Sequence, residues 1–189
     1  IQLSEFPVKT ILVIGASGFI GSHLIEHGLA QGKFRFIGVD TESAKIQPWL
    51  NQKNFEFFQS DYQDLNELDE IIQKTDLVLS LAALCNPAQY NTVPLQVIES
   101  NYTQPLKLVE KCHHYQTPII HLSTSEVYGR TLGSYVSQDS SNNDENASQA
   151  FHPINPKLVE DETPYLLGPV HEQRWSYASA KQLLERSIY

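Results

Sequence analysis

The sequence has 189 residues, 41% of them hydrophobic, which is enough for one globular domain with a buried core. Its net charge of −9, from 13 basic and 22 acidic residues, argues against a nucleic-acid partner, because phosphate backbones are bound by clustered lysine and arginine. No apolar run is long enough for a membrane-spanning helix, and Cys85 and Cys112 lack the spacing of metal ligands. We therefore expect a cytoplasmic protein with reduced thiols, no metal and no membrane partner.

Short apolar segments alternate with helical patterns along the chain. Strands are predicted at residues 10–14, 34–40, 55–59, 76–81 and 119–123. Helices are predicted at residues 20–31, 43–50, 65–74, 95–115 and 174–189. Strands separated by helices are typical of parallel βαβ units, so the expected fold is α/β, a doubly wound parallel sheet (the Rossmann fold).

One polar segment interrupts this alternation. Residues 134–149 read SYVSQDSSNNDENASQ and contain almost no side chains that form cores. A segment of this composition is predicted to be a flexible surface insertion. The rest of residues 1–189 is expected to form a single domain of this fold.

The first predicted strand runs into a glycine-rich turn, GASGFIG. Its glycines allow a tight turn, close approach to a pyrophosphate and close packing of the next helix on the strand. That helix would present free N–H groups to the phosphates. The cofactor contacts predicted in this turn are Gly15, Ser17, Gly18, Phe19, Ile20 and Gly21.

Two acidic residues lie at the ends of the next two predicted strands: Asp40 ends the second, and Asp61 comes shortly after the third. Asp40 comes 19 residues after Gly21, where a carboxylate binds the ribose 2′-hydroxyl of NAD and repels the 2′-phosphate of NADP. Asp61 is placed either to contact the adenine or its ribose, or to cap the helix that begins near Leu65. The sequence therefore favours NAD over NADP.

Tyr177 and Lys181 lie four residues apart, so both belong to one face of the last predicted helix. A lysine cation and the positive nicotinamide of NAD⁺ would favour the phenolate and lower the tyrosine pKa, which lets the phenolate accept a hydroxyl proton. The alternative is an amphipathic helix with a solvated lysine. The segment STSEVYG (123–129) follows the fifth strand, at the edge of the sheet where ligands bind in this fold; its alternative is a polar loop with capping hydroxyls.

Together, the glycine turn, the STSEVYG segment and the Tyr177–Lys181 pair resemble the extended short-chain dehydrogenase/reductase family, which includes nucleotide-sugar epimerases, 4,6-dehydratases and decarboxylases. The resemblance implies NAD as cofactor, a UDP-sugar as substrate, and a homodimer formed by helices 95–115 and 174–189. It also implies a sugar-binding lobe beyond residue 189. Further cofactor contacts are implied at Leu81, Ala82, Ala83 and Asn101, beside Tyr177 and Lys181.

Finer motifs narrow the resemblance to two branches of that family. Segments 86–92, 168–170, 173–177 and 181–186 are similar to UDP-glucuronate decarboxylases of the polymyxin-resistance type and to plant UDP-apiose/UDP-xylose synthases. Thr124 matches the hydroxyl that binds the reacting sugar oxygen, and Glu126 matches a functional glutamate. Ser125 matches the decarboxylase, where 4,6-dehydratases have aspartate and the apiose-forming enzyme has cysteine. The implied substrate contacts are Pro87, Tyr90 and Arg174.

The resemblance implies an enzyme that oxidises C4 of UDP-glucuronate and decarboxylates it to a UDP-pentose. Its implied catalytic residues are Tyr177, Lys181, Thr124, Ser125 and Glu126. One alternative is a nucleotide-sugar 4-epimerase. The other is a non-catalytic NAD-binding module, which has no need of Tyr177, Lys181 and Thr124 together.

Overall fold

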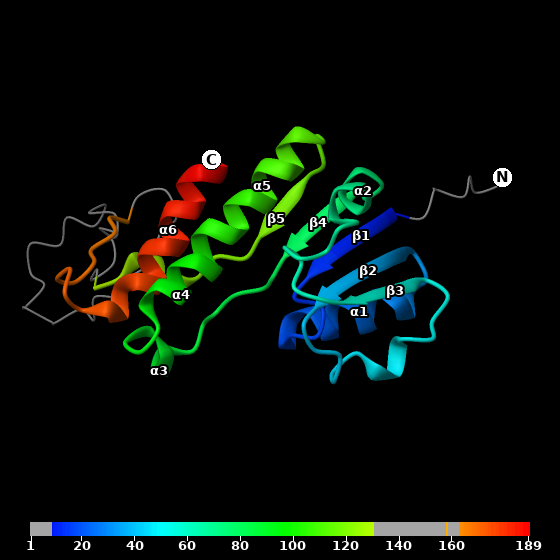
Figure 1. Ribbon diagram of the computed structural model, residues 1–189, viewed down its shortest axis with the longest axis horizontal. Coiled ribbons are helices and arrows are strands. Elements are labelled where there is room, and N and C mark those ends of the chain that lie inside the picture. Colours follow the sequence, from blue (N-terminus) through cyan, green and yellow to red (C-terminus); the bar gives the residue numbers. More distant parts are fainter. Residues whose placement is uncertain (1–8, 131–157, 159–162) are drawn as a thin grey trace, which may run out of the picture.

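The computed structural model describes residues 9–130, 158 and 163–189. Within these residues, five strands form one sheet in the order β3-β2-β1-β4-β5, and every neighbouring pair is parallel (Figure 1). The strands are β1 (Lys9–Ile14), β2 (Phe34–Asp40), β3 (Phe55–Gln59), β4 (Leu77–Ser80) and β5 (Ile119–His121). The predicted doubly wound parallel sheet is confirmed.

Both faces of the sheet are covered by helices. Along β1, Ile11 and Val13 belong to one buried cluster and Leu12 and Ile14 to the other, as expected from the twofold alternation of a strand. Helix α1 (Phe19–Gln31) covers the first face, and α2 (Leu68–Gln73) and α5 (Gln104–His114) cover the second. The strand order reverses between β1 and β4, which is where open α/β sheets form their ligand crevice.

Two predicted helices differ in the structure. Residues 43–50 contain only a 3-10 turn, Gln47–Trp49, instead of the predicted α-helix. Pro48 is the reason, because a proline inside a helix lacks an N–H donor and clashes with the preceding turn. The predicted helix 65–74 shortens to α2, since residues before Leu68 form turns.

The long predicted helix 95–115 is present but is not uniform. It consists of α4 (Pro94–Ile98), a π-helical turn (Glu99–Thr103) and α5. A further short helix, α3 (Pro87–Tyr90), was not predicted; Pro87 is its first residue, and the side chain of Asn86 accepts a hydrogen bond from the N–H of Ala88.

The last element is α6 (Ser176–Ile188), which follows a 3-10 turn, Gln173–Trp175. It packs against α4 and the π-helical turn, away from the strands β1 to β3 (Figure 1). A third buried cluster, Tyr90, Val97 and Tyr177, forms there. The predicted insertion 134–149 lies outside the described residues.

No helix among the described residues is both long enough and apolar enough to cross a membrane.

Candidate active site

The turn after β1 has the geometry of a phosphate cradle. Gly15 has a φ of +87°, and a Cβ on it would lie 2.8 Å from the backbone nitrogen of Ala82 in the segment after β4. A Cβ on Gly21 would overlap the carbonyl oxygen of Gly15. Helix α1 begins after Gly18 without a side-chain cap, so the free N–H groups of its first turn remain available to an anion.

Asp40 lies at the end of β2 and holds this turn from the side. Its Oδ2 accepts a hydrogen bond from the backbone N–H of Ser17 at 2.9 Å, and its Oδ1 accepts one from the N–H of Glu42 at 3.1 Å. The Ser17 hydroxyl in turn accepts from the N–H of Lys45 at 3.3 Å. Ser17 is buried and supports the turn, and its predicted contact with the cofactor stays a prediction. Each Asp40 oxygen retains a lone pair with which to accept a ribose hydroxyl.

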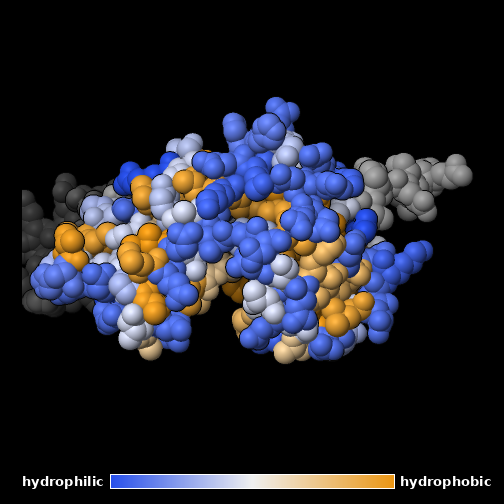
Figure 2. All heavy atoms as spheres, in the orientation of Figure 1, coloured by the Kyte–Doolittle hydropathy of each residue, from blue (hydrophilic) through white to orange (hydrophobic). Residues whose placement is uncertain are grey.

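Ten of the predicted cofactor contacts line one cavity of about 520 Å³. Figure 2 shows a hollow in the surface between the part of the molecule that carries α3 and the part that carries α1. In Figure 1, the segment after β4 connects these two parts. Residues without a predicted role also contribute, among them Thr41, Tyr62, Ser100 and Gln104. The predicted residues in the lining are Gly15, Gly18, Phe19, Ile20, Gly21, Asp40, Asp61, Leu81, Ala82 and Ala83.

Asp61 lies in this lining and shapes the loop after β3. Its Oδ1 accepts a hydrogen bond from the N–H of Gln63 at 3.0 Å, and its backbone oxygen accepts from Asp64. It does not cap α2, whose N-cap position is Glu67. Of the two interpretations drawn from the sequence, the structure is compatible with the contact to adenine or ribose, which stays a prediction.

Asn101 lies in the π-helical turn and has an exposed fraction of 0%. Its Nδ2 donates to the carbonyl oxygens of Leu84, at 3.0 Å, and Val97, at 2.8 Å. The amide thereby ties the α4–α5 helix to the segment after β4 that borders the cavity. Its neighbours Ser100 and Gln104 line the cavity, whereas Asn101 is not among the lining residues, so its predicted contact with the cofactor stays a prediction.

Tyr177 lies in the first turn of α6 and is 6% exposed. Its ring stacks on that of Tyr90, with 5.2 Å between centroids and 18° between planes. Burial, Cys85 and Glu126 raise the pKa of the Tyr177 phenol, while a hydrogen bond with Thr124 acts in the opposite direction. The surrounding residues alone therefore do not produce the lowered pKa that the sequence predicts.

Lys181 follows one helical turn later and is 2% exposed, so the alternative of a solvated lysine is wrong. Its Nζ donates to the carbonyl oxygen of Leu122 at 2.9 Å and lies 3.0 Å from Nε2 of His121. Burial lowers the pKa of Lys181 to about 8, against opposing contributions from Cys85 and Glu185. An ammonium with this pKa changes charge near neutral pH.

The segment after β5 forms a 3-10 turn, Ser125–Tyr128, capped by Thr124. The Thr124 Oγ1 accepts a hydrogen bond from the N–H of Glu126 at 3.2 Å, so the capping interpretation holds beside the contact with Tyr177. Glu126 forms an ion pair with Arg174 at 2.9 Å. Ser125 is exposed and faces a second cavity of about 660 Å³ that also borders Thr124 and Glu185.

The three predicted substrate contacts lie in different settings. Tyr90 is 1% exposed, and its hydroxyl has no hydrogen-bond partner among the described residues; burial, Glu126 and Tyr177 are the main causes that raise its pKa. Pro87 is exposed at the start of α3. Arg174 is exposed and lies over the Trp175 ring, 5.4 Å from its centroid. Their roles as substrate contacts stay predictions.

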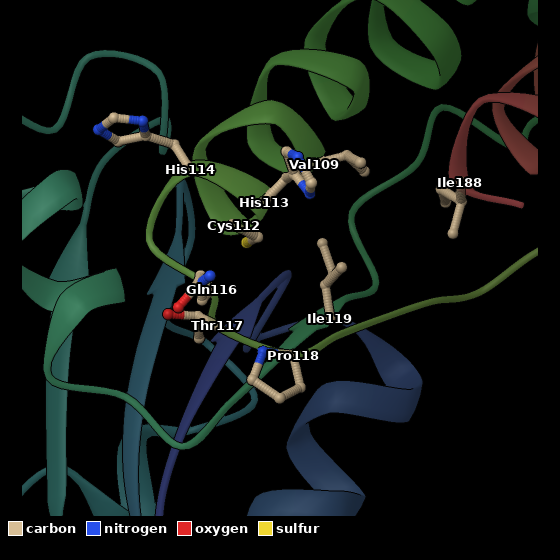
Figure 3. A pocket seen from close by; sticks show the side chains of 9 residues that line it. All are labelled: Val109, Cys112, His113, His114, Gln116, Thr117, Pro118, Ile119 and Ile188. Atoms are coloured by element: carbon tan, nitrogen blue, oxygen red, sulfur yellow. The ribbon is translucent and has the colours of Figure 1, made fainter.

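A further cavity, of about 670 Å³, lies elsewhere. Figure 3 shows it between α5, β5 and α6, with Ile119 and Ile188 on opposite sides. Burial raises the pKa of Cys112 in its lining to about 11, so this thiol is unreactive at neutral pH. None of the predicted site residues lines it.

Reasoning from the sequence missed His121, Ser80 and Cys85 as members of the site. Ser80 and His121 lie in strands that were interpreted as apolar, and Cys85 was interpreted only as a reduced thiol. A histidine at the end of a buried parallel strand is the signal that could have found the first two. In the part of the chain that the structure describes, no three or more His, Cys, Asp or Glu side chains gather as a metal site would require.

Comparison with known proteins gives the same family as the motifs. Residues 11–188 match the NAD dependent epimerase/dehydratase family. UDP-D-apiose/UDP-D-xylose synthase 1 of Arabidopsis thaliana is 39% identical over 197 residues, which cover 100% of this chain and 49% of that protein. The chain thus spans about half the length of the curated relatives it matches.

Solved structures agree with this assignment. The crystal structure of PbgP3 protein from Burkholderia pseudomallei has a TM-score of 0.77 and 29% identity, covering 96% of this chain and 48% of that one. A UDP-glucuronic acid 4-epimerase from Bacillus cereus, in complex with UDP-glucuronic acid and NAD, has a TM-score of 0.66 and 25% identity, covering 94% and 50%. With its glycine turn, Asp40 and the cavity between β1 and β4, this chain belongs to the NAD dependent epimerase/dehydratase family, and its cofactor is NAD.

Proposed function

We propose that this chain is the NAD-binding and catalytic half of an enzyme that oxidises C4 of UDP-glucuronate and decarboxylates it to a UDP-pentose. The similarity to UDP-D-apiose/UDP-D-xylose synthases supports a nucleotide-sugar substrate. The observation that carries the proposal is the pair of buried residues Tyr177 and Lys181 on α6, with the Glu126–Arg174 ion pair nearby. This arrangement brings a proton acceptor, Tyr177, and a cation, Arg174, to the same side of the sheet.

The fit of NAD rests on the cradle. Gly15 leaves no room for a side chain against the segment after β4, Gly21 leaves none against the carbonyl oxygen of Gly15, and the uncapped start of α1 suits a pyrophosphate. Asp40 lines the same cavity, which supports its assignment to the adenosine ribose. When bound, NAD⁺ supplies the hydride acceptor and a positive charge on its nicotinamide ring.

In the proposed reaction, Tyr177 accepts the proton of the C4 hydroxyl as that carbon is oxidised to a ketone. The product is a β-keto acid, whose carboxylate leaves as CO₂ because the ketone takes up the electron pair as an enolate. The hydroxyls of Tyr177 and Thr124 are placed to stabilise the developing oxyanion. Ser125 and Glu126 are the candidates for delivering a proton to C5.

Arg174 and Glu126 give the proposed site its substrate selectivity. The Arg174 guanidinium is half exposed and already holds one carboxylate, that of Glu126, at 2.9 Å. A planar guanidinium has donors for a second carboxylate or a phosphate. We therefore assign the uronate or diphosphate of the substrate to this residue, beside Tyr90 and Pro87.

A 4-epimerase is the second candidate, favoured by the 25% identity to the UDP-glucuronic acid 4-epimerase structure. The same Tyr177, Thr124 and Lys181 suit both reactions, since each begins with oxidation at C4. They differ in whether the carboxylate survives. The burial of Tyr177 and Lys181 beside the NAD cavity argues against a non-catalytic binding module, because a pure binder gains nothing from a buried lysine.

The deciding experiment incubates the full-length protein with UDP-glucuronate and NAD⁺ and follows the products by mass spectrometry. Loss of CO₂ with formation of a UDP-pentose is expected, and the pentose (keto, xylose or apiose) identifies the subtype. A UDP-hexuronate of unchanged mass with inverted C4 would instead establish the epimerase. Turnover of neither, with NAD still bound, would support the binding module.

Homodimerisation is a further part of the proposal. Leu95 and Ile98 on α4 and Leu183 on α6 are 80%, 38% and 46% exposed, which is unusual for apolar side chains on neighbouring helices. We propose that these helices, within 95–115 and 174–189, pack against a second copy. Light scattering of the full-length protein should give the mass of a dimer; the mass of a monomer at micromolar concentration would refute it. Placement in the cytoplasm stays a prediction.

A further inference from the structure

His121, the last residue of β5, lies between two buried polar groups from other elements. Its Nδ1 is 2.9 Å from the hydroxyl of Ser80 on β4, and its Nε2 is 3.0 Å from the Nζ of Lys181 on α6. Ser80 is 3% exposed and Lys181 is 2% exposed. The next residue, Leu122, binds both partners through its backbone: its N–H donates to the Ser80 carbonyl, and its carbonyl accepts from Lys181.

The chemistry of the lysine fixes the proton on the imidazole. An ammonium has three N–H donors and no lone pair, so Nε2 of His121 must accept from Lys181. A neutral ring then carries its proton on Nδ1, and this N–H donates to the Ser80 hydroxyl. Lys181 thus has one donor held by His121 at the end of β5 and one by the carbonyl of Leu122 directly after it, and a third remains for the active site.

We propose that His121 is the positioning residue of Lys181: as the Nδ1–H tautomer locked by Ser80, it holds the lysine ammonium through Nε2. The inference rests on the proposed function, because the ammonium matters through its effect on Tyr177 and the cofactor. It assigns a role to a pair of strand residues, Ser80 and His121, that face the helix carrying the catalytic tyrosine. Neither strand residue need touch the substrate.

The surrounding charges support this assignment. Burial and the Lys181 charge lower the pKa of His121 to about 3, so the ring is neutral at neutral pH. The groups that face Lys181 are Cys85, after β4, and Glu185, one turn along α6, both of which raise its pKa against burial; Tyr177 precedes it by one turn. Glu185 accepts a hydrogen bond from Ser123, whereas the hydrogen-bond partners of the ammonium are Nε2 of His121 and the carbonyl oxygen of Leu122.

The tautomer can be measured directly. Full-length protein labelled with ¹⁵N-histidine is observed by long-range ¹H–¹⁵N NMR at pH 7, and the His121 signals are assigned from their loss in H121Q. The expected pattern is a protonated Nδ1 and an unprotonated Nε2. An imidazolium, or the Nε2–H tautomer, would overturn the proposal, since neither can accept from the lysine.

The role in catalysis is tested by pH profiles of turnover for H121F, H121Q and S80A. Phenylalanine removes the acceptor, so the Lys181 pKa falls and the alkaline limb should move about one to two pH units lower. The glutamine oxygen replaces Nε2 as acceptor, so H121Q should keep the limb close to that of the wild type. S80A should shift it less than H121F and in the same direction. If H121F lowers the turnover rate equally at every pH and the alkaline limb of its pH profile stays where it is in the wild type, His121 has only a structural role.

The two measurements separate this inference from the proposed function. The tautomer is observed without substrate, so it decides the His121–Lys181 contact even if UDP-glucuronate is not turned over. Absence of turnover in the wild type would instead defeat the proposed function. A correct tautomer with an unmoved pH profile would leave the proposed reaction intact and reject the positioning role.

Discussion

The two ends of the cleft are built in different ways. The cradle after β1 consists of backbone: its shape depends on glycines with no room for a Cβ and on amides bound by Asp40. The catalytic end consists of side chains from β4, β5, α3 and α6, which meet only in the folded chain. The first kind of site tolerates few substitutions in one short segment, whereas the second depends on residues up to about a hundred positions apart.

The largest difference between the two ends, a loss of turnover without a loss of NAD binding, is expected from Y177F. It removes the phenolic proton acceptor but keeps the ring that stacks on Tyr90. Loss of a general acid–base group should reduce turnover by roughly 100- to 10,000-fold, measured with the substrate of the full-length enzyme. NAD affinity, from calorimetry, should stay within about twofold. An equal loss of NAD binding would show that the two ends are not separable.

At the cradle, G15A should abolish NAD binding and destabilise the fold by about 2 to 5 kcal/mol, from backbone strain and from the clash with Ala82. G32A is the matched control, since Gly32 has a φ of +66° but nothing within 4 Å of its missing Cβ. It should cost only the strain of a left-handed residue, about 1 to 2 kcal/mol, and leave NAD binding intact. Denaturant titrations measure the stability of G15A and G32A, and calorimetry measures their NAD binding. Equal losses in the two variants would contradict a role for the close approach of Gly15 to Ala82.

D40A should weaken NAD binding by roughly tenfold or more, because it removes a charged acceptor for the cradle amides and for the ribose. It should also narrow the preference for NAD over NADP. D76A is the control: Asp76 likewise accepts a backbone N–H, that of Thr10, but at the opposite end of β1. Unchanged selectivity in D40A, by competition of the two cofactors, would remove Asp40 from the site.

The smallest effect concerns pH and the catalytic end. The folded-state pKa of His121, about 3, lies below its ordinary value of 6.5, so the unfolded chain binds more protons between these values. Stability linked to His121 is therefore present above about pH 6.5 and is lost as the pH falls towards 3. Between pH 7 and pH 5, the melting temperature should fall more for the wild type than for H121Q. An equal fall in melting temperature for the wild type and H121Q would show that His121 is not buried as a neutral ring.

The same contrast explains what the sequence could predict. The strands, the cradle and Asp40 follow from local patterns, since each needs particular residues within a short segment. The prediction that one helix carries both Tyr177 and Lys181 is also confirmed, because it depends only on their spacing. Interactions across elements had no such signal: the stacking of Tyr90 on Tyr177, the Arg174–Glu126 pair and the contact of His121 with Lys181 depend on how α3, β5 and α6 pack.

Local patterns also failed where proline and turn geometry intervene. The helical periodicity of residues 43–50 predicted a helix that Pro48 prevents, although Ile46 is fully buried as the pattern requires. The role of Lys181 was predicted as an electrostatic effect on Tyr177, yet burial is the main influence on the pKa of both residues. Burial depends on the whole fold, and residue spacing alone does not specify it.

The π-helical turn Glu99–Thr103 accommodates one residue more than regular winding would. Its residues therefore turn through about the same angle as one residue fewer of regular helix, so α4 and α5 keep nearly the relative orientation of one continuous helix. Within this turn, Asn101 reaches the carbonyl oxygen of Leu84, while Val97 on α4 stays in the cluster behind Tyr177. A further residue inserted into the regular winding of α4 would have no such compensation. It would rotate the preceding residues by about 100° and remove their side chains from that cluster.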